Sequence, residues 1–162
     1  MCGFVGCFGK VDDKVISAGN SILHRGPDEQ KYIKGNDWSI QFNRLSIIDL
    51  SNSAMQPFSF NEVDVYVNGE IYNYIELKKK YENEFTFKTS SDVEIIPFLY
   101  LKYGIDFLNK INGMFSMVII DKKNDKKFLI RDRFGKKPLY YTEKNGMVYF
   151  SSEIKALNHF IK

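Results

Sequence analysis

The hydrophobic positions follow strand-like spacing at both ends of the chain and helix-like spacing between them. Residues 3–9 are small and apolar, which predicts a buried strand. Residues 63–67 alternate between apolar and polar side chains, as a strand should. The polar loop 122–126 and the dipeptide Asn145-Gly146 each separate two strand-like segments, and both predict hairpins. Further strands are predicted over residues 30–33, 38–45, 114–121, 127–133, 138–142 and 147–151.

Three helices are predicted. The first begins at Asp12 or Asp13 and runs to about Leu23, with its apolar side chains on one face. The second covers residues 72–82. The third opens at Ser91-Asp92-Val93-Glu94, which has the spacing of a capping box, and ends near Gly104, with Pro97 inside it where it should bend the helix. Strands at both ends with helices between them predict an α+β protein, with sheets packed face to face and helices outside.

Composition narrows the class of protein. The chain has 162 residues, 44% hydrophobic and 27% charged, which is the size and balance of one globular domain. Its net charge of +3 is small and scattered, so a nucleic-acid surface is not expected. No apolar run approaches the roughly 20 residues of a membrane span, and the N-terminus lacks the features of a secretion signal.

The two cysteines exclude a disulfide framework and a complete zinc site. Cys2 and Cys7 are five positions apart in a strand-like segment, so their side chains should point to opposite faces. We therefore expect reduced cysteines, a cytoplasmic protein and no metal site.

Cys2 is the first candidate for chemistry. Removal of Met1 leaves an α-amino group, with a reference pKa of about 7.7–8.0, on the same residue as a thiol of about 8.5. That amine can take the thiol proton and later protonate a leaving group, so one residue supplies nucleophile and base. With Met1 attached, the Cys2 nitrogen is an amide, and the hypothesis therefore requires the processed chain. Met1-Cys2 alone is more typical of a buried apolar cysteine.

Asn68-Gly69-Glu70 allows two interpretations of equal weight. Asn-Gly after an alternating strand is most often a hairpin turn. The same pair can instead point a carboxamide and a backbone N–H at an oxyanion, with Glu70 beside them to hold a cation.

Arg44 and Asp92 are candidates for substrate binding. Arg44 lies among apolar residues at a strand end, where it is either a salt-bridged surface residue or a two-pronged clamp for a carboxylate. Asp92 either favours a helix dipole or binds an ammonium group.

His24 supports a competing hypothesis, a Cys2–His24 pair of the thiol-protease kind. No third residue that would orient His24 can be named from the sequence, and a role in stabilising the loop is the simpler interpretation.

Taken in order, these segments resemble the glutaminase domain of glutamine-dependent asparagine synthetases, a class II glutamine amidotransferase. Each block is weak alone, but the series in this order is specific and covers nearly the whole chain. The phosphoribosyl- and hexosamine-type relatives share the N-terminal cysteine but differ in the middle blocks. The matching blocks are Met1 to Gly6, His24-Arg25-Gly26-Pro27-Asp28, Arg44 to Asp49, Gln56-Pro57, Asn68 to Asn73, Ser91 to Glu94, Asn112 to Phe115, Arg131 to Gly135, Lys137 to Tyr141 and Ser152 to Leu157.

The resemblance implies a four-layer αββα sandwich of the N-terminal nucleophile hydrolase type. It also implies hydrolysis of L-glutamine to glutamate and ammonia through a glutamyl thioester. The implied roles are Cys2 as nucleophile with its own α-amine as base, Asn68 and Gly69 as the oxyanion hole, Arg44 for the substrate α-carboxylate, Glu70 and Asp92 for its α-ammonium group, and the backbone of Leu45, Ser46, Ile47 and Ile48 as pocket lining.

The resemblance further implies a single glutamine amidotransferase type 2 domain over residues 1–162. In the family a synthetase domain follows, which binds ATP and magnesium, activates aspartate and receives ammonia. Its Ser-Gly-Gly-x-Asp-Ser loop is absent from this sequence. We therefore expect no cofactor in this chain, and either an excised domain or a separate subunit whose partner is a synthetase domain. The resemblance leaves a homodimer open.

Two other functions remain open at this stage. The ammonia could serve another acceptor, such as a sugar carboxylate in a polysaccharide. Alternatively, the chain could be a glutamine-binding module without catalysis, although the presence of Cys2 argues against this.

Overall fold

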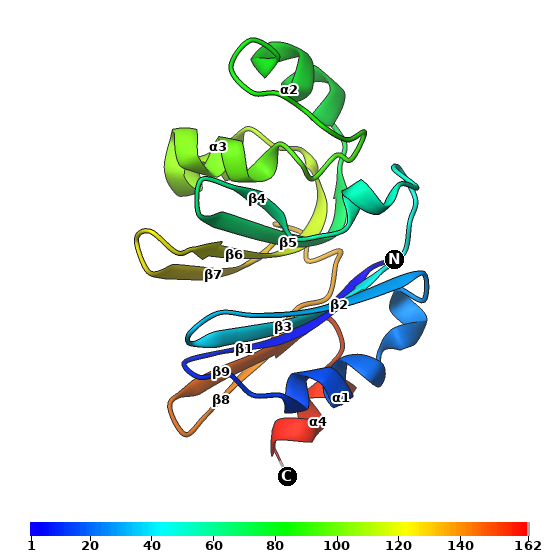
Figure 1. The fold of residues 1–162 in the computed structure, drawn as a ribbon, viewed down its shortest axis with the longest axis vertical. Helices are drawn as coiled ribbons and strands as arrows, with labels where there is room; N and C mark the ends of the chain where they lie inside the picture. Colours follow the sequence, from blue (N-terminus) through cyan, green and yellow to red (C-terminus); the bar gives the residue numbers. More distant parts are fainter. Residues whose placement is uncertain (162) are drawn as a thin grey trace. The chain divides into compact units, whose positions relative to one another are not determined.

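The computed structural model describes residues 1–161 and divides into two compact units. The first unit contains residues 1–45 and the described residues from 137 onward, and the second contains residues 46–136. Each unit is an antiparallel sheet with helices on one face (Figure 1). Within residues 1–161, no helix has the length and apolar content needed to cross a membrane.

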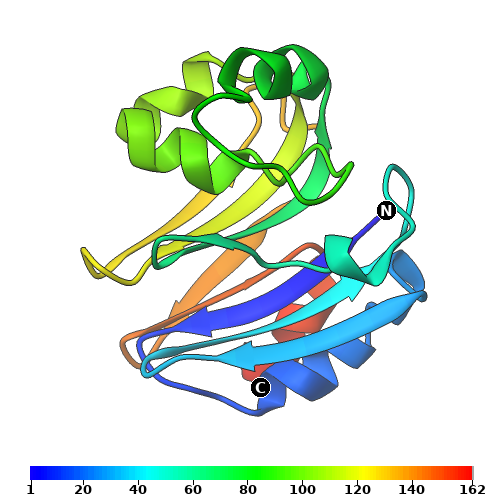
Figure 2. The same cartoon turned by 45° about the horizontal axis from the view of Figure 1, so that its top comes forward.

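The first unit is built on a five-stranded sheet in the order β2-β3-β1-β9-β8. Helices α1 and α4 cover one face of it, where Val5 and Cys7 pack against their apolar side chains (Figures 1 and 2). The opposite face of β1 and β3 carries Phe4, Ile40 and Phe42, which are also fully buried. The elements are β1 (Gly3–Phe8), α1 (Lys14–Asn20), the 3₁₀ helix η1 (Leu23–Arg25), β2 (Glu29–Lys34), β3 (Trp38–Arg44), β8 (Tyr140–Lys144), β9 (Met147–Ser151) and α4 (Ile154–Ile161).

The second unit is built on a four-stranded sheet in the order β4-β5-β6-β7. Side chains of β5 and β6 that point toward α3, such as Val65, Val67 and Met117, form its core. The elements are the 3₁₀ helix η2 (Asn52–Ala54), β4 (Phe58–Phe60), β5 (Val63–Ile71), α2 (Tyr74–Tyr81), α3 (Ile96–Tyr103), the 3₁₀ helix η3 (Gly104–Asn109), β6 (Gly113–Asp121) and β7 (Lys126–Arg131).

Most predicted strands and the helix over residues 72–82 are confirmed, but two helix predictions are wrong in detail. The first helix ends at Asn20, and the chain then forms the separate 3₁₀ turn η1. The third helix begins at Ile96, not at Ser91, so Pro97 lies in its first turn, where a missing N–H costs no hydrogen bond. Glu94 does not close a capping box, because its carboxylate accepts the backbone N–H groups of Lys88 and Thr89.

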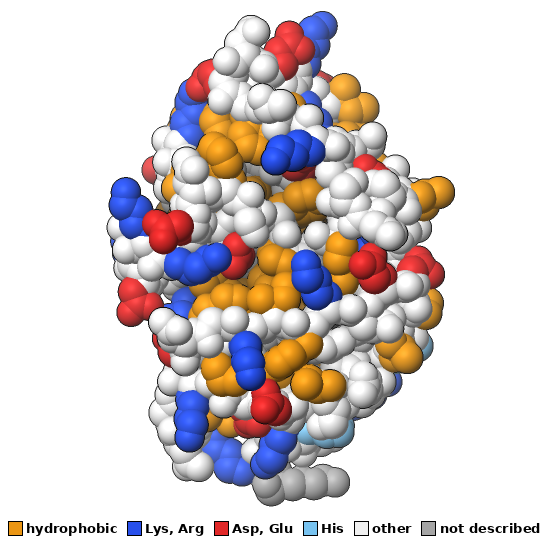
Figure 3. Space-filling view, in the orientation of Figure 1, with side chains coloured by type: hydrophobic (Ala, Val, Ile, Leu, Met, Phe, Trp, Pro, Cys, Tyr) orange, Lys and Arg blue, Asp and Glu red, His pale blue; other side chains and the backbone are white. Residues whose placement is uncertain are grey.

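The surface shows no single-sign field on the face drawn in Figure 3. Basic and acidic side chains are interspersed there, with apolar side chains between them. Among residues 1–161, no group of three or more His, Cys, Asp or Glu side chains is placed to hold a metal ion.

Candidate active site

Cys2 lies at the start of the first unit, directly before β1. Its Sγ is 3.4 Å from the backbone nitrogen of Leu45, which donates to it, and 3.6 Å from the Leu45 carbonyl oxygen. Burial raises the pKa of the Cys2 thiol above its ordinary value, although the hydrogen bond from the Leu45 N–H lowers it in part. The thiol is therefore protonated at neutral pH and needs a base to become a nucleophile.

Two charged side chains to which the sequence analysis gave no role hold residue 2 in place. Arg25 does so directly, and Glu153 does so through Arg25. Arg25 Nε donates to the Cys2 carbonyl oxygen at 3.2 Å, and Arg25 Nη1 is 3.4 Å from Glu153. Both residues fall in blocks that carry the family resemblance, which was the available signal. Cys2 is thus held through its carbonyl as well as through its thiol.

The Cys2–His24 pair is not formed within the described residues. His24 Nε2 is instead 2.9 Å from Glu153, and its side chain is 55% exposed. The His24 imidazole thus pairs with Glu153, and His24 makes no hydrogen bond to Cys2. The structure favours the loop-stabilising interpretation.

Arg44 ends β3 and is buried with only 5% of its surface exposed, so it is not the surface residue that one interpretation expected. It is salt-bridged, because its Nη1 lies 3.2 Å from Glu29 on the neighbouring strand β2. Next in sequence is Leu45, whose backbone contacts Cys2. The first unit thus brings Cys2 and the Arg44–Leu45 segment together.

Asn68 and Gly69 lie inside β5 in the second unit, opposite Ser116 and Phe115 of β6, so the hairpin interpretation is wrong. A Cβ at Gly69 would lie 2.1 Å from the Met114 carbonyl oxygen, which explains why this strand position holds glycine. Asn68 is fully buried.

The Asn68 carboxamide has hydrogen-bonding capacity left over. Its Nδ2 donates to Ser116 Oγ at 3.4 Å, while its Oδ1 accepts no hydrogen bond from any residue in 1–161. A half-turn of the carboxamide exchanges these atoms, so that Ser116 would donate to Oδ1 and the NH₂ group would become available. A buried amide with an unused side is unusual unless a ligand completes it.

Two further side chains fix the segment around Asn68. Gln56 accepts the Val67 N–H and donates to the Val67 carbonyl, so its carboxamide holds the residue before Asn68. At the other end of β5, Asp92 Oδ2 accepts the Ile71 N–H at 2.7 Å. The sequence analysis had no role for Gln56, although Gln56-Pro57 is one of the matching blocks.

Asp92 and Glu70 are two acidic side chains of the second unit that interact electrostatically. Asp92 is 5% exposed, and burial raises the pKa of its carboxyl above the ordinary 3.8, with the negative charge of Glu70 adding to the effect. A cation placed beside them would offset both contributions. Asp92 precedes α3 without belonging to it, so the helix-dipole interpretation is not supported.

Three of the residues predicted to line the pocket, Ser46, Ile47 and Ile48, begin the second unit as a loop without regular structure. Ile47 and Ile48 are 53% and 38% exposed. The structure leaves these large apolar side chains accessible on a loop, a feature that often marks a binding region.

Comparison with solved structures identifies the fold. Glutamine phosphoribosylpyrophosphate amidotransferase from B. subtilis, complexed with ADP and GMP, superimposes with a TM-score of 0.80 at 20% identity over 97% of this chain and 43% of that chain. The structure of an allosteric regulatory enzyme of purine biosynthesis gives a TM-score of 0.77 over 98% of this chain, also at 20% identity. The predicted α+β class is confirmed.

Comparison of sequences identifies the family. The profile of the glutamine amidotransferase domain family matches residues 1–162, and the chain belongs to this family.

Two relatives come from Bacillus subtilis (strain 168). Glutamine-hydrolyzing asparagine synthetase 2 is 51% identical over an alignment of 141 positions that covers 85% of this chain and 18% of that protein. Glutamine-hydrolyzing asparagine synthetase 1 is 41% identical over an alignment of 168 positions, gaps included, that covers 97% of this chain and 26% of that protein. The chain therefore spans well under a third of the length of these relatives.

Proposed function

We propose that the chain hydrolyses L-glutamine to L-glutamate and ammonia, with Cys2 of the processed chain as nucleophile. The observation that carries the proposal is the contact of the Cys2 thiol with the backbone next to Arg44. This contact puts the nucleophile beside a buried guanidinium of the kind that binds carboxylates in a two-pronged manner. Membership of the glutamine amidotransferase domain family supports the choice of substrate.

In the proposed reaction, the α-amine of Cys2 takes the thiol proton and the thiolate attacks the side-chain amide carbon of glutamine. The Asn68 NH₂ and the Gly69 N–H stabilise the resulting oxyanion. The α-ammonium group then protonates the departing nitrogen, and ammonia leaves as the glutamyl thioester forms. Water cleaves the thioester, which yields glutamate and restores the thiol.

Substrate binding is assigned to three charged side chains. Arg44 holds the α-carboxylate, while Asp92 and Glu70 hold the α-ammonium group. The raised pKa of Asp92 supports this assignment, because a buried carboxylate next to a second acid is stabilised by a bound cation. The backbone of residues 45–48 lines the pocket.

We further propose that the ammonia serves asparagine synthesis from aspartate in a partner synthetase domain, which would bind ATP and magnesium. The names of the two Bacillus relatives support this acceptor over a sugar carboxylate. We assign the reaction to the cytoplasm, because both cysteines are free and Cys2 must stay reduced.

The proposal is tested by ammonia release from L-glutamine, with mass spectrometry to verify that Met1 is absent. We expect turnover by the processed chain and none by Cys2→Ala. Turnover that survives in Cys2→Ala contradicts the mechanism. A processed, folded chain that releases no ammonia, even with an added synthetase domain, contradicts the function.

A further inference from the structure

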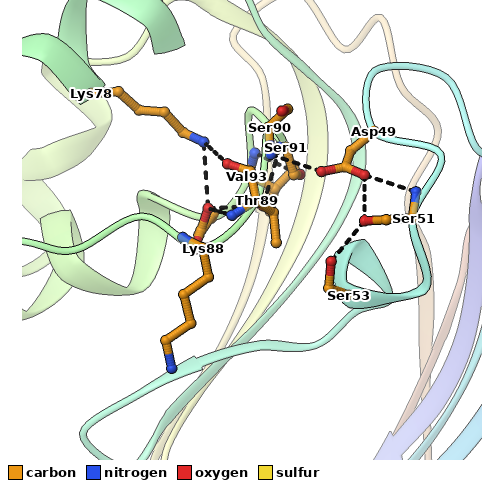
Figure 4. Close-up of polar contacts among 10 residues, drawn as sticks. Asp49, Ser51, Ser53, Lys78, Lys88, Thr89, Ser90, Ser91 and Val93 are labelled. Carbon is orange, nitrogen blue, oxygen red and sulfur yellow. Dashed lines mark hydrogen bonds and ion pairs between the residues drawn. The ribbon is translucent and has the colours of Figure 1, made fainter.

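Asp49 connects two loops of the second unit. Its Oδ1 accepts the Ser51 N–H at 2.8 Å and the Ser51 hydroxyl at 2.6 Å, and its Oδ2 accepts the Ser90 N–H at 2.7 Å (Figure 4). The bond between Asp49 and Ser90 joins residues that are 41 positions apart in the sequence. Hydrogen bonds to a carboxylate are roughly twice as strong as neutral ones, so Asp49 is an effective tie between the loops.

The two loops are the ones to which the proposed function assigns glutamine contacts. Ser46, Ile47 and Ile48 directly precede Asp49, and Asp92 follows Ser90 by two positions. Neither stretch belongs to a helix or a strand, so regular backbone hydrogen bonding does not fix either of them. A binding group on a loop needs such external support to hold its position within about 0.5 Å.

The Asp92 loop is anchored separately on its other side. Glu94 accepts the N–H groups of Lys88 and Thr89 and the Thr89 hydroxyl. Lys78 of α2 donates to the Thr89 carbonyl at 2.8 Å (Figure 4). These bonds fix the loop to α2. The bond from Ser90 to Asp49 adds a connection to the loop of residues 46–51, which the Glu94 cluster does not reach.

We propose that Asp49 is a positioning residue that sets the distance between the backbone of residues 46–48 and the Asp92 carboxylate. In this role Asp49 does not touch the substrate. It fits the pocket to a ligand that carries an α-ammonium group, so it determines preference for an α-amino acid over the same amide without the amine. This inference rests on the proposed function.

The test compares Asp49→Asn with Asp125→Asn. Asparagine at position 49 keeps the shape but replaces one accepting oxygen with NH₂, so the Ser90 bond or the Ser51 pair is lost. Asp125→Asn makes the same change of charge on a side chain that is 87% exposed. The backbone φ of Asp125 is 50°, a conformation that asparagine tolerates. It is therefore a matched control.

For Asp49→Asn we expect KM for L-glutamine to rise about tenfold, the equivalent of one hydrogen bond to a charged group, with little change in kcat. The preference for L-glutamine over glutaramate, which lacks the α-amino group, should fall by a similar factor. Merely lowered stability would scale turnover of both substrates equally. Asp125→Asn should match the parent chain in every respect.

A second measurement keeps the inference testable if Asp49→Asn does not fold. Ser51→Ala removes the hydroxyl that donates to Asp49 but keeps the Ser51 N–H bond. KM should therefore rise only about threefold, because one hydrogen bond is lost and the bond to Ser90 remains. Unchanged KM and unchanged substrate preference in a folded Asp49→Asn, or in Ser51→Ala if that is the only folded variant, overturn the positioning role. An inactive parent chain overturns the proposed function instead.

Discussion

Residues 68–69 and residues 145–146 are both Asn-Gly, yet the two pairs have opposite structural roles. Asn145 and Gly146 both have positive φ, at 53° and 74°, and join β8 to β9 as a tight turn. Asn68 and Gly69 lie within β5 and pair with β6. The exposed pair closes a local hairpin, whereas Asn68 is buried and Gly69 half-buried within a paired strand. Tertiary pairing therefore decides the role of a dipeptide that is compatible with both.

The asparagines give the largest predicted difference. Asn68→Ala should lower kcat for glutamine hydrolysis about 10²- to 10³-fold, because it removes one oxyanion donor. Asn145→Ala should leave kcat unchanged. Steady-state ammonia release from both variants, with circular dichroism to verify folding, checks the prediction. Equal kcat values in the two variants would mean that Asn68 has only a structural role.

The glycines extend the comparison to stability. Gly69→Ala places a Cβ 2.1 Å from the Met114 carbonyl oxygen, so the β5–β6 pairing must shift, at a cost of about 3 kcal/mol. At Gly146 nothing lies within 4 Å of the added Cβ. Only the positive φ is unfavourable for alanine there, which costs about 1–2 kcal/mol. Urea denaturation measures both changes, and a less stable Gly146→Ala than Gly69→Ala would contradict the strand geometry around Gly69.

The raised pKa of Asp92 predicts a smaller effect, on the pH dependence of kcat/KM. Because burial raises its pKa above 3.8, Asp92 takes up a proton at a higher pH than an ordinary aspartate, and binding of the α-ammonium group weakens there. kcat/KM should therefore fall on the acid side, and Asp92→Asn should lower kcat/KM at neutral pH and flatten this limb. If kcat/KM of Asp92→Asn falls at low pH as it does in the parent chain, the group that titrates there is not Asp92.

The stability of the same variant should change in the opposite direction. A folded pKa above the unfolded one means that the ionised carboxylate costs stability above the folded pKa, and that this cost is relieved as the pH falls through it. Asparagine can still accept the Ile71 N–H. Asp92→Asn should thus unfold at neutral pH at a temperature no lower than the parent chain, and a clearly lower melting temperature would contradict this account of the burial.

His24→Ala should have the smallest effect. His24 contacts Glu153 and is largely exposed, so we expect turnover within about twofold of the parent and a stability loss under about 1 kcal/mol. Ammonia release and thermal unfolding measure the two quantities. Loss of turnover with intact folding would revive the Cys2–His24 hypothesis.

The sequence predicted the strands better than the elements that depend on distant contacts. Alternating residues 63–67 and the turn at Asn145-Gly146 carry their own signals, and both predictions are confirmed. The start of α3 carries no such local signal, because Glu94 bonds to the preceding loop instead of capping the helix. Spacing alone cannot distinguish these two uses of one carboxylate.

The candidate site shows the same limit. Cys2, Arg44 and Asn68 were identified as candidates from residue chemistry, and the resemblance selected among the roles left open. Arg25, Gln56 and Asp49 were not identified, because each acts by bonding to a backbone segment far away in the sequence. Such supporting residues have no local pattern, and only the folded chain shows which segment they hold.

The central claim is that the thiol and the base belong to one residue, and acylation of matched N-termini tests it most directly. One chain has Met1 removed, and the other carries an additional serine before Cys2, which keeps the thiol but converts its nitrogen to an amide. Intact-mass spectrometry after mixing with L-glutamine follows formation of the glutamyl thioester. We expect acylation of the processed chain and a rate about 10²- to 10⁴-fold lower in the extended chain. Equal acylation rates would contradict the claim.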